Sequence, residues 1–255
     1  MGQFFAKDWT GEPFQLFGSA HLTALAVVLV INLAIVFAWR NPSPRSRRIV
    51  RYTLASVLVV NETLWHVWNY TTGQWTIQTM LPLHLCSVMV WLSAYMLAFE
   101  NYALYEFVYF MGIGAAMQAL LTPDAGRYGF PHFRFFQTVV SHGAIITAAV
   151  YMTAIEGFRP YGKSLLRLVI GLNIYMAFVM VVNSWIGSNY LFIARKPDTA
   201  SLIDVLGPWP WYILSIEGIG VVICLILYLP FVIRDWRAKV IAAKQSDKNR
   251  ILQYD

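Results

Sequence analysis

Residues 81–99 read LPLHLCSVMVWLSAYMLAF, an apolar run long enough to cross a bilayer. A transmembrane helix needs about 20 mainly apolar residues, because each residue adds about 1.5 Å of rise and the hydrocarbon core is about 30 Å thick. Two side chains with useful chemistry, His84 and Cys86, lie within its first two turns. Ionisable groups inside a membrane are costly, and they usually face a protein interior or an aqueous cavity. We therefore take this run as the centre of the fold and of the candidate site.

The composition of the whole chain is that of a polytopic membrane protein. Of its 255 residues, 58% are hydrophobic and only 13% are charged, whereas about a quarter of a soluble domain is charged. The two cysteines, Cys86 and Cys224, fall in apolar spans at different expected depths, so a disulfide between them is not expected. The first 17 residues contain Lys7, Asp8 and Glu12 and no continuous apolar core, so no cleavable signal peptide is expected.

Six further apolar runs accompany residues 81–99 and predict an all-α membrane protein with seven transmembrane helices. The seven spans are expected at about 21–39, 52–70, 81–99, 102–121, 137–155, 168–187 and 213–233. A basic tail, 234–255, follows the last span, and the chain is expected to form a single integral membrane domain. No internal repeat is visible, which counts against an inverted-repeat transporter.

The basic residues are distributed unevenly between the two ends of these spans. With the N-terminus outside, 14 of the 19 Lys and Arg residues fall on the inner side: in the turn 40–51, after the fifth span and in the tail. The positive-inside rule then places the N-terminus outside and the C-terminus in the cytoplasm. The net charge of +6 is therefore a topology signal with anionic lipid as its partner, and nucleic-acid binding is not expected.

Polar side chains from five of the spans are expected at one depth, roughly 5 to 12 Å below the outer surface. Glu62 and His66 share one face of the second span, because they are four residues apart. The members of this polar layer are Glu62, His66, Cys86, His142, Asn183 and Glu217. Their convergence predicts one shared site that opens toward the outer leaflet.

Cys86 and His142 are the candidate catalytic residues. A thiol becomes a nucleophile when a nearby imidazole takes its proton, and a third polar group usually orients that imidazole. His142 is the expected base, with a structural histidine bonded to a backbone carbonyl as the alternative. Glu62 is expected either to orient this base or to pair with His66.

The remaining candidates are expected to support the site or bind substrate. His84 faces nearly away from Cys86 on a regular helix, and it reaches the site only if Pro82 distorts the first turn. Gln118 and Asn183 are candidate oxyanion donors, although hydrogen bonding between helices is the commoner role for such residues. Glu217 is either part of the site or a protonated structural residue.

Several longer motifs support a family resemblance that begins at residues 81–86. The chain resembles the YwaF-like bacterial integral membrane proteins over roughly residues 15–235, and the motifs that carry the resemblance are Thr122-Pro123-Asp124, Gly129-Phe130-Pro131-His132-Phe133-Arg134-Phe135, Gly187-Ser188-Asn189-Tyr190 and Leu206-Gly207-Pro208-Trp209-Pro210-Trp211-Tyr212. That family is similar in turn to a mammalian transmembrane acyltransferase of ether phospholipids, which is thought to use a membrane cysteine. It is more distantly similar to the androgen-induced hydrolases of fatty-acid esters, which use a membrane threonine and histidine. The resemblance implies that Cys86 is the acyl-accepting nucleophile and His142 its general base.

We therefore expect a bacterial plasma-membrane enzyme that acts on phospholipids or other fatty-acyl lipids through a thioester on Cys86, without a cofactor. One alternative is a zinc-dependent amide or ester hydrolase similar to the seven-span ceramidases, with His66, His84 and His142 as ligands, although no contiguous ligand motif supports a metal. The other alternative is a receptor, transporter or lipid-binding protein without catalysis. The lipid, the acceptor and the oligomeric state do not follow from the sequence.

Overall fold

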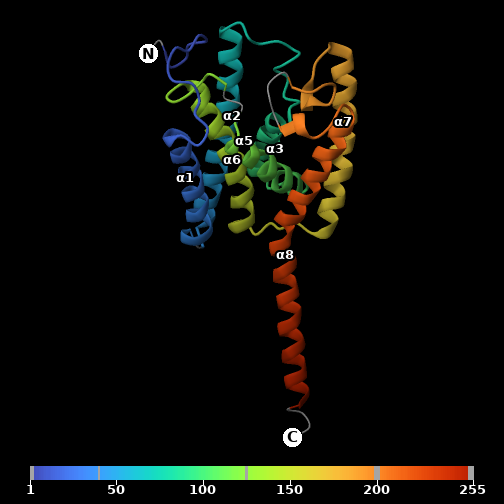
Figure 1. The fold of residues 1–255 in the computed structure, drawn as a ribbon. Coiled ribbons are helices and arrows are strands. Elements are labelled where there is room, and N and C mark those ends of the chain that lie inside the picture. The colour runs from blue at the N-terminus through green and yellow to red at the C-terminus, as the bar shows by residue number, and fades with distance from the viewer. Residues whose placement is uncertain (1–2, 40, 124–125, 198–201, 252–255) are drawn as a thin grey trace.

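The computed structural model describes residues 3–39, 41–123, 126–197 and 202–251, apart from the side chains of 202 and 246–251. Every regular element in these ranges is a helix, which confirms the predicted all-α class (Figure 1). The elements are α1 (Ser19–Leu33), η1 (Ala34–Ala38), α2 (Pro44–Thr71), α3 (Leu85–Phe99), α4 (Tyr102–Phe107), η2 (Val108–Gly112), α5 (Ile113–Leu121), α6 (Phe133–Ala154), α7 (Gly162–Ile186), η3 (Tyr190–Phe192), η4 (Leu202–Val205) and α8 (Trp211–Ile251).

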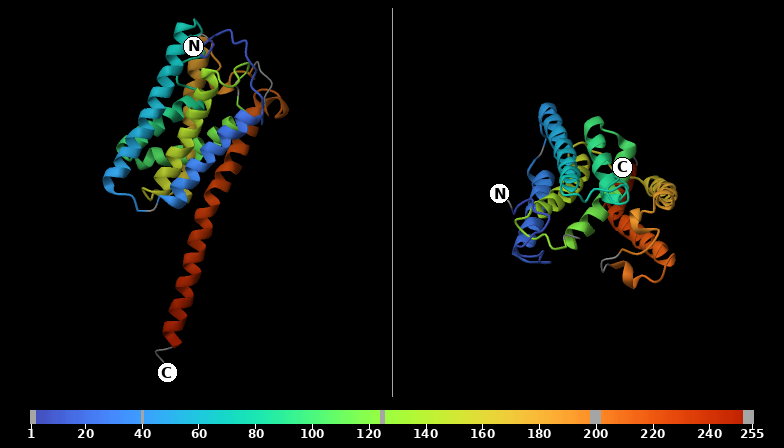
Figure 2. Two further views of the ribbon diagram at one scale, coloured as in Figure 1. Left: turned by 90° about the vertical axis from the view of Figure 1, so that its left-hand side faces the viewer. Right: turned by 90° about the horizontal axis from the view of Figure 1, so that it is seen from above.

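The helix α6 is the centre of the bundle, because it packs against α1, α2, α3 and α5 (Figures 1 and 2). Glycines let its neighbours approach closely. A Cβ on Gly143 would lie 2.9 Å from Val28 of α1, and a Cβ on Gly112 of η2 would lie 3.0 Å from Ile145. Close approach at small residues is how helices gain van der Waals contact in a lipid solvent. The helices α2, α3, α5 and α6 form the closely packed part of the molecule.

Five helical segments are long and apolar enough to cross a membrane, and they correspond to five of the seven predicted spans. They are Ser19–Ala38, Tyr102–Leu121, Phe133–Ala154, Gly162–Ile186 and Trp211–Gln245. The helices α2 and α3 do not meet the same measure, because polar residues such as Asn61, Glu62, His66 and Asn69 lower the hydropathy of α2 beyond its arginines, and α3 has only 15 residues. The five helices establish a membrane protein, while the seven-span count and the orientation stay predictions.

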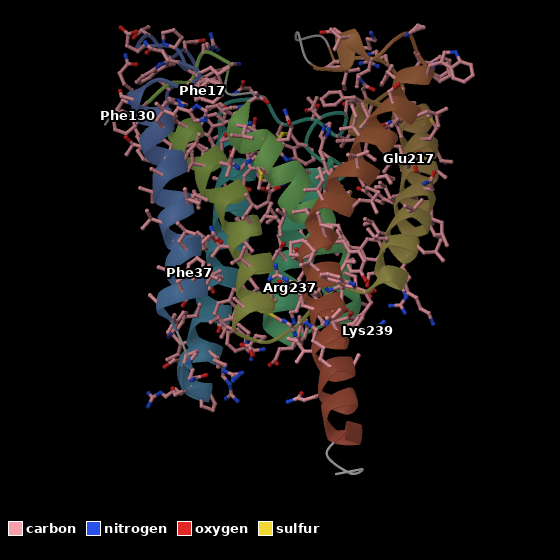
Figure 3. The ribbon with its side chains drawn as sticks, turned by 60° about the horizontal axis from the view of Figure 1, so that its bottom comes forward. Phe17, Phe37, Phe130, Glu217, Arg237 and Lys239 are labelled. Atoms are coloured by element: carbon pink, nitrogen blue, oxygen red, sulfur yellow. The ribbon has the colours of Figure 1, made fainter. Side chains whose placement is uncertain are left out.

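The helices α7 and α8 stand at the edge of the bundle (Figure 2). The main contacts of α7 are with α4 and η3, and the main contacts of α8 are with η2 and α5. The helix α8 continues well beyond the other elements (Figure 1), and Figure 3 labels Arg237 and Lys239 in its lower part. The predicted basic tail is therefore helical as far as Ile251.

Ion pairs hold together the end of the bundle from which α8 projects. Arg51 of α2 pairs with Glu100, which follows α3, and with Glu156, which follows α6. Arg167 near the start of α7 donates to both carboxylate oxygens of Glu106 in α4. We call this end the α8 face, and we call the opposite end, where the N-terminal segment packs, the N-terminal face (Figure 1).

The chain enters α3 through a turn, and this difference from the predicted third span positions the candidate site. Residues 81–84 are not helical, so α3 begins four residues later than expected. The Tyr190 hydroxyl holds the turn, because it donates to the Ile77 carbonyl and accepts from the Leu81 amide, at 2.7 and 2.8 Å. Backbone groups outside a helix need such partners in a membrane. Cys86 is thus the second residue of a helix that starts below the upper end of α2 (Figure 1).

Candidate functional site

Glu62 of α2 is the buried acid of the candidate site. The residue is 3% exposed, and the adjacent helix α3 presents Cys86 and Ser87 to it. The Ser87 hydroxyl faces the Glu62 carboxylate, and the Cys86 thiol lies close enough for the carboxylate charge to act on it. The candidate nucleophile and a buried carboxylate therefore lie on two helices that pack against each other.

His66, one turn further along α2, has a defined tautomer. The Trp75 indole N–H donates to its Nδ1 at 3.1 Å. Indole is only a donor, so Nδ1 is unprotonated and Nε2 carries the ring proton. That Nε2 lies 3.7 Å from Oε1 of Glu62. The sequence left two roles open for Glu62, to orient His142 or to pair with His66, and this distance corresponds to the second.

His142 has the opposite tautomer. Its Nδ1 lies 2.7 Å from the Thr138 carbonyl oxygen, one turn back on α6. A carbonyl only accepts, so Nδ1 carries the proton and Nε2 keeps its lone pair. The bond is the one expected of a structural histidine, and it also leaves Nε2 able to accept a proton.

The helices α3 and α6 are in contact, and they carry Cys86 and His142 respectively. No hydrogen bond joins these two side chains in the described part of the chain. Their direct pairing, expected from the sequence, therefore stays a prediction.

Arg134 is a residue of this cluster that sequence reasoning missed. The predicted span 137–155 leaves Arg134 out, but α6 begins at Phe133 and includes it. Its guanidinium carbon lies 4.1 Å from the centroid of the Trp65 ring, and its charge acts on both Glu62 and His142. The signal available in the sequence was a single arginine between aromatic residues, directly before an apolar run.

Three of the predicted supporting residues have other neighbours. The His84 ring packs against the rings of Tyr190 and Phe192, with centroids 5.1 and 5.3 Å away. The Asn183 side chain binds the Tyr190 backbone. Its Nδ2 donates to the Tyr190 carbonyl oxygen, and its Oδ1 accepts from the Tyr190 backbone N–H. Gln118 is exposed and donates to a threonine one turn along its own helix. These contacts give all three a structural role.

Glu217 lies at the edge of the bundle on α8 (Figure 3). The Asn173 side chain of α7 donates to its Oε1 at 2.6 Å. This bond ties α7 to α8, and such interhelical hydrogen bonds are a common role for polar residues in membranes.

The three histidines of the zinc alternative do not share a set of neighbours. His66 contacts Glu62, His84 contacts Tyr190, and His142 bonds to its own helix. Among the described residues, no group of three or more His, Cys, Asp or Glu side chains could hold a metal ion. The zinc alternative therefore gains no ligand set from the fold.

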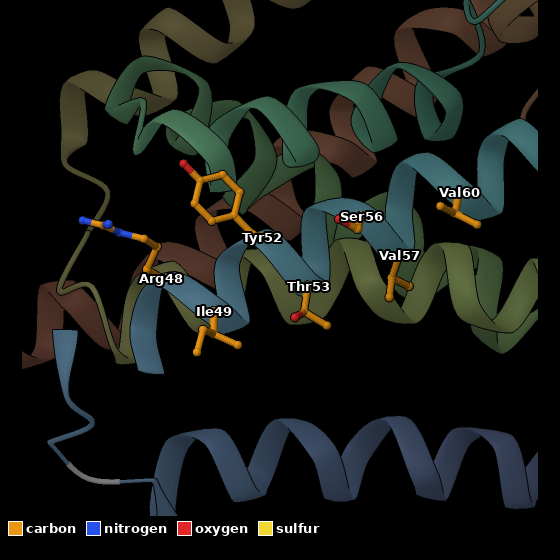
Figure 4. Close-up of a pocket in the computed structure, with 7 residues that line it drawn as sticks. All are labelled: Arg48, Ile49, Tyr52, Thr53, Ser56, Val57 and Val60. Atoms are coloured by element: carbon orange, nitrogen blue, oxygen red, sulfur yellow. The ribbon is translucent and has the colours of Figure 1, made fainter. Parts of the chain in front are cut away.

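A shallow groove follows the outer side of α2, on a different face from Glu62 (Figure 4). Its lining is apolar with a few hydroxyl groups and one arginine, and comprises Arg48, Ile49, Tyr52, Thr53, Ser56, Val57 and Val60. It holds neither a cysteine nor a histidine, so it is a lipid-facing surface apart from the candidate site.

The helices and the polar cluster between them define an integral membrane protein with ionisable groups enclosed by its central helices. The chain belongs to the TMEM164 family, which matches residues 16–228 and so includes every member of the cluster. No curated protein and no solved structure matches the chain.

Proposed function

We propose that the protein is a lipid acyltransferase or fatty-ester hydrolase that forms an acyl thioester on Cys86. The proposal includes seven membrane spans, an external N-terminus and the plasma membrane of a bacterium as its location. The chain is expected to resemble the YwaF-like proteins, which are similar in turn to an ether-phospholipid acyltransferase. The proposal assigns the corresponding activity to this chain.

One observation carries the proposal. Cys86 stands in the first turn of α3, within range of the charge of the buried Glu62, on one of three helices, α2, α3 and α6, that pack against one another. A thiol that served only for packing needs no such surroundings, since free cysteine behaves as a small hydrophobe. Cys224 of α8, which is 2% exposed within the apolar core, is an example of that role.

The first half of the reaction moves the acyl group to sulfur. Nε2 of His142 accepts the Cys86 thiol proton, and the sulfur forms a bond to the ester carbonyl carbon. The ester C–O bond then breaks, and the proton passes from His142 to the oxygen of the leaving alcohol. In the apo protein such catalytic contacts are often long, and they tighten when substrate binds.

The second half releases the acyl group. Water or an acceptor alcohol gives its proton to His142, and its oxygen bonds to the thioester carbonyl carbon. The C–S bond breaks and the proton returns to sulfur. The first-turn amides of α3 receive no side-chain cap, so they are suited to stabilise the oxyanion of each step. They take the role that the sequence assigned to Gln118 and Asn183.

The test is mass spectrometry of the purified protein incubated with a phospholipid. We expect an acyl adduct on Cys86 that hydroxylamine removes. Cys86→Ala should abolish the adduct, and Cys86→Ser should impair turnover severely, because a hydroxyl needs a stronger base than a thiol. Cys224→Ala is the matched control and should keep turnover close to that of the wild type.

Two results would redirect the proposal. Turnover that survives Cys86→Ala but is lost with a chelator would favour the zinc hydrolase. A folded protein that binds lipid without turnover or adduct would favour a receptor, transporter or lipid-binding protein.

A further inference from the structure

Arg134 is a cation at the start of α6, between the candidate site and the N-terminal face. It is the second residue of α6, and its guanidinium lies over the Trp65 ring of α2, with 4.1 Å from the guanidinium carbon to the ring centroid. One guanidinium nitrogen also donates to the side-chain oxygen of Gln137. Stacking and hydrogen bonding together fix the plane of a side chain that is otherwise among the most mobile.

The position of Arg134 along α6 sets it outward of the proposed chemistry. His142 lies eight residues further into the helix, which is about 12 Å of rise. The charge of Arg134 nevertheless reaches both His142 and Glu62. A ligand group held at Arg134 would therefore lie nearer the N-terminal face than the atoms that react.

This order matches the layers of a phospholipid in a leaflet. The phosphate lies at the surface, and the ester carbonyls lie one glycerol unit deeper. A planar guanidinium matches the oxygens of a phosphate with two parallel hydrogen bonds. Arg134 also stands at the positive end of the α6 dipole, which favours an anion at the same place.

We propose that Arg134, held by Trp65, binds the phosphate of the acyl donor and so selects phospholipids over neutral acyl esters. This inference rests on the proposed function of Cys86 but assigns a separate task. Arg134 determines which lipid is bound, while Cys86 and His142 perform the transfer.

The test compares two donors with the same acyl chains, a phosphatidylglycerol and a diacylglycerol, in detergent micelles. For Arg134→Gln we expect KM for the phospholipid to rise about tenfold or more, since a hydrogen bond to a charged group is lost. KM for diacylglycerol, which has no phosphate, should stay within about twofold of the wild type. Arg134→Lys keeps the charge without the planar fork, and it should recover only part of the loss.

Arg127→Gln is the matched control, because it removes a cation from the same end of the molecule. Arg127 lies in the loop before α6 and pairs with Asp8. Its removal should leave KM for both donors unchanged.

Two outcomes would overturn the inference. Equal losses on both donors would make Arg134 a structural counter-ion of Glu62, and no loss on either would remove it from the site. Absence of any Cys86 adduct in the wild type would defeat the proposed function instead. In that case thermal stabilisation tests the binding role of Arg134 without turnover. The phospholipid, but not diacylglycerol, should stabilise the wild type, and Arg134→Gln should lose this stabilisation.

Discussion

Trp75 and His66 are joined by a hydrogen bond from the indole N–H to the imidazole Nδ1, at 3.1 Å. While this bond holds, His66 cannot carry a second proton, so the ring that approaches Glu62 is a neutral imidazole. The two histidines nearest the candidate site therefore have opposite tautomers, with the proton on Nε2 in His66 and on Nδ1 in His142.

This arrangement predicts the nitrogen spectrum of both rings. In protein labelled with ¹⁵N histidine, Nδ1 of His66 and Nε2 of His142 should show the chemical shifts of unprotonated imidazole nitrogen near neutral pH. Trp75→Phe should turn His66 into a mixture of tautomers and leave His142 unchanged. A protonated Nδ1 on His66 in the wild type would contradict the assignment.

Tyr190 predicts a stability effect, because one buried hydroxyl serves two backbone groups of the turn before α3. Tyr190→Phe leaves the Leu81 amide and the Ile77 carbonyl without that partner, which should cost about 1–3 kcal/mol. Thermal unfolding in detergent should show a lower midpoint, and Cys86 should be alkylated faster because its helix starts in a loosened turn. Tyr70→Phe is the control, since Tyr70 is 76% exposed. Equal midpoints for the two variants would exclude Tyr190 as the support of this turn.

His132 predicts a pH dependence at the N-terminal face. The side chain is fully buried. Its Nδ1 accepts a hydrogen bond from the Arg134 backbone N–H, and its Nε2 is hydrogen-bonded to the Ala6 carbonyl oxygen. Burial lowers the pKa of His132 from its ordinary value, so the unfolded chain binds the proton more readily than the folded protein. The contribution of neutral His132 to the free energy of unfolding is present above about pH 6.5 and is lost as the pH falls below that value.

The unfolding midpoint of the wild type should therefore fall more steeply between about pH 7 and pH 5 than that of His132→Gln, which does not titrate. Parallel curves for the two proteins would show that His132 does not control this dependence. Proteolysis of the first residues at the lower pH offers a second readout, because His132 anchors Ala6.

The orientation predicts a labelling pattern in intact cells. Single cysteines at Ser46 and Lys244 should be shielded from a membrane-impermeant thiol reagent, whereas a cysteine at Thr76 should react. The reason is the excess of basic residues at the α8 face, which the positive-inside rule places in the cytoplasm. Lysed cells serve as the control, where all three should react. Labelling at Ser46 before lysis would reverse the orientation.

Hydropathy predicted the helices well, because a membrane helix is specified by composition over a long stretch. The segment Tyr102–Leu121 has the limits expected for the fourth span. The start of α3 was harder to predict. Leu81 and Leu83 are as apolar as their helical neighbours, and they leave the helix because Tyr190 and Tyr175, from a distant part of the chain, satisfy their backbone groups.

The sequence allowed a prediction of the depth of the candidate site residues, but none of the direction of their side chains. Counting residues along a span gives the height of a side chain, and it does not give the neighbour that the side chain faces. Asn183 was expected in the same layer as Cys86, and His84 was expected to reach the site only through a distorted first turn, yet both contact the η3 segment. Arg134 escaped notice for the opposite reason, since it was assigned to a loop and its partner Trp65 was read as part of an apolar span.

The length of α8 has a mechanical consequence. Its 41 residues correspond to about 60 Å of helix, twice the thickness of the hydrocarbon layer. About half of this rod therefore extends past the bilayer core into the aqueous phase. A helix is stiff compared with a coiled linker, so the far turns of α8 are held away from the membrane at a distance that the length of the helix sets.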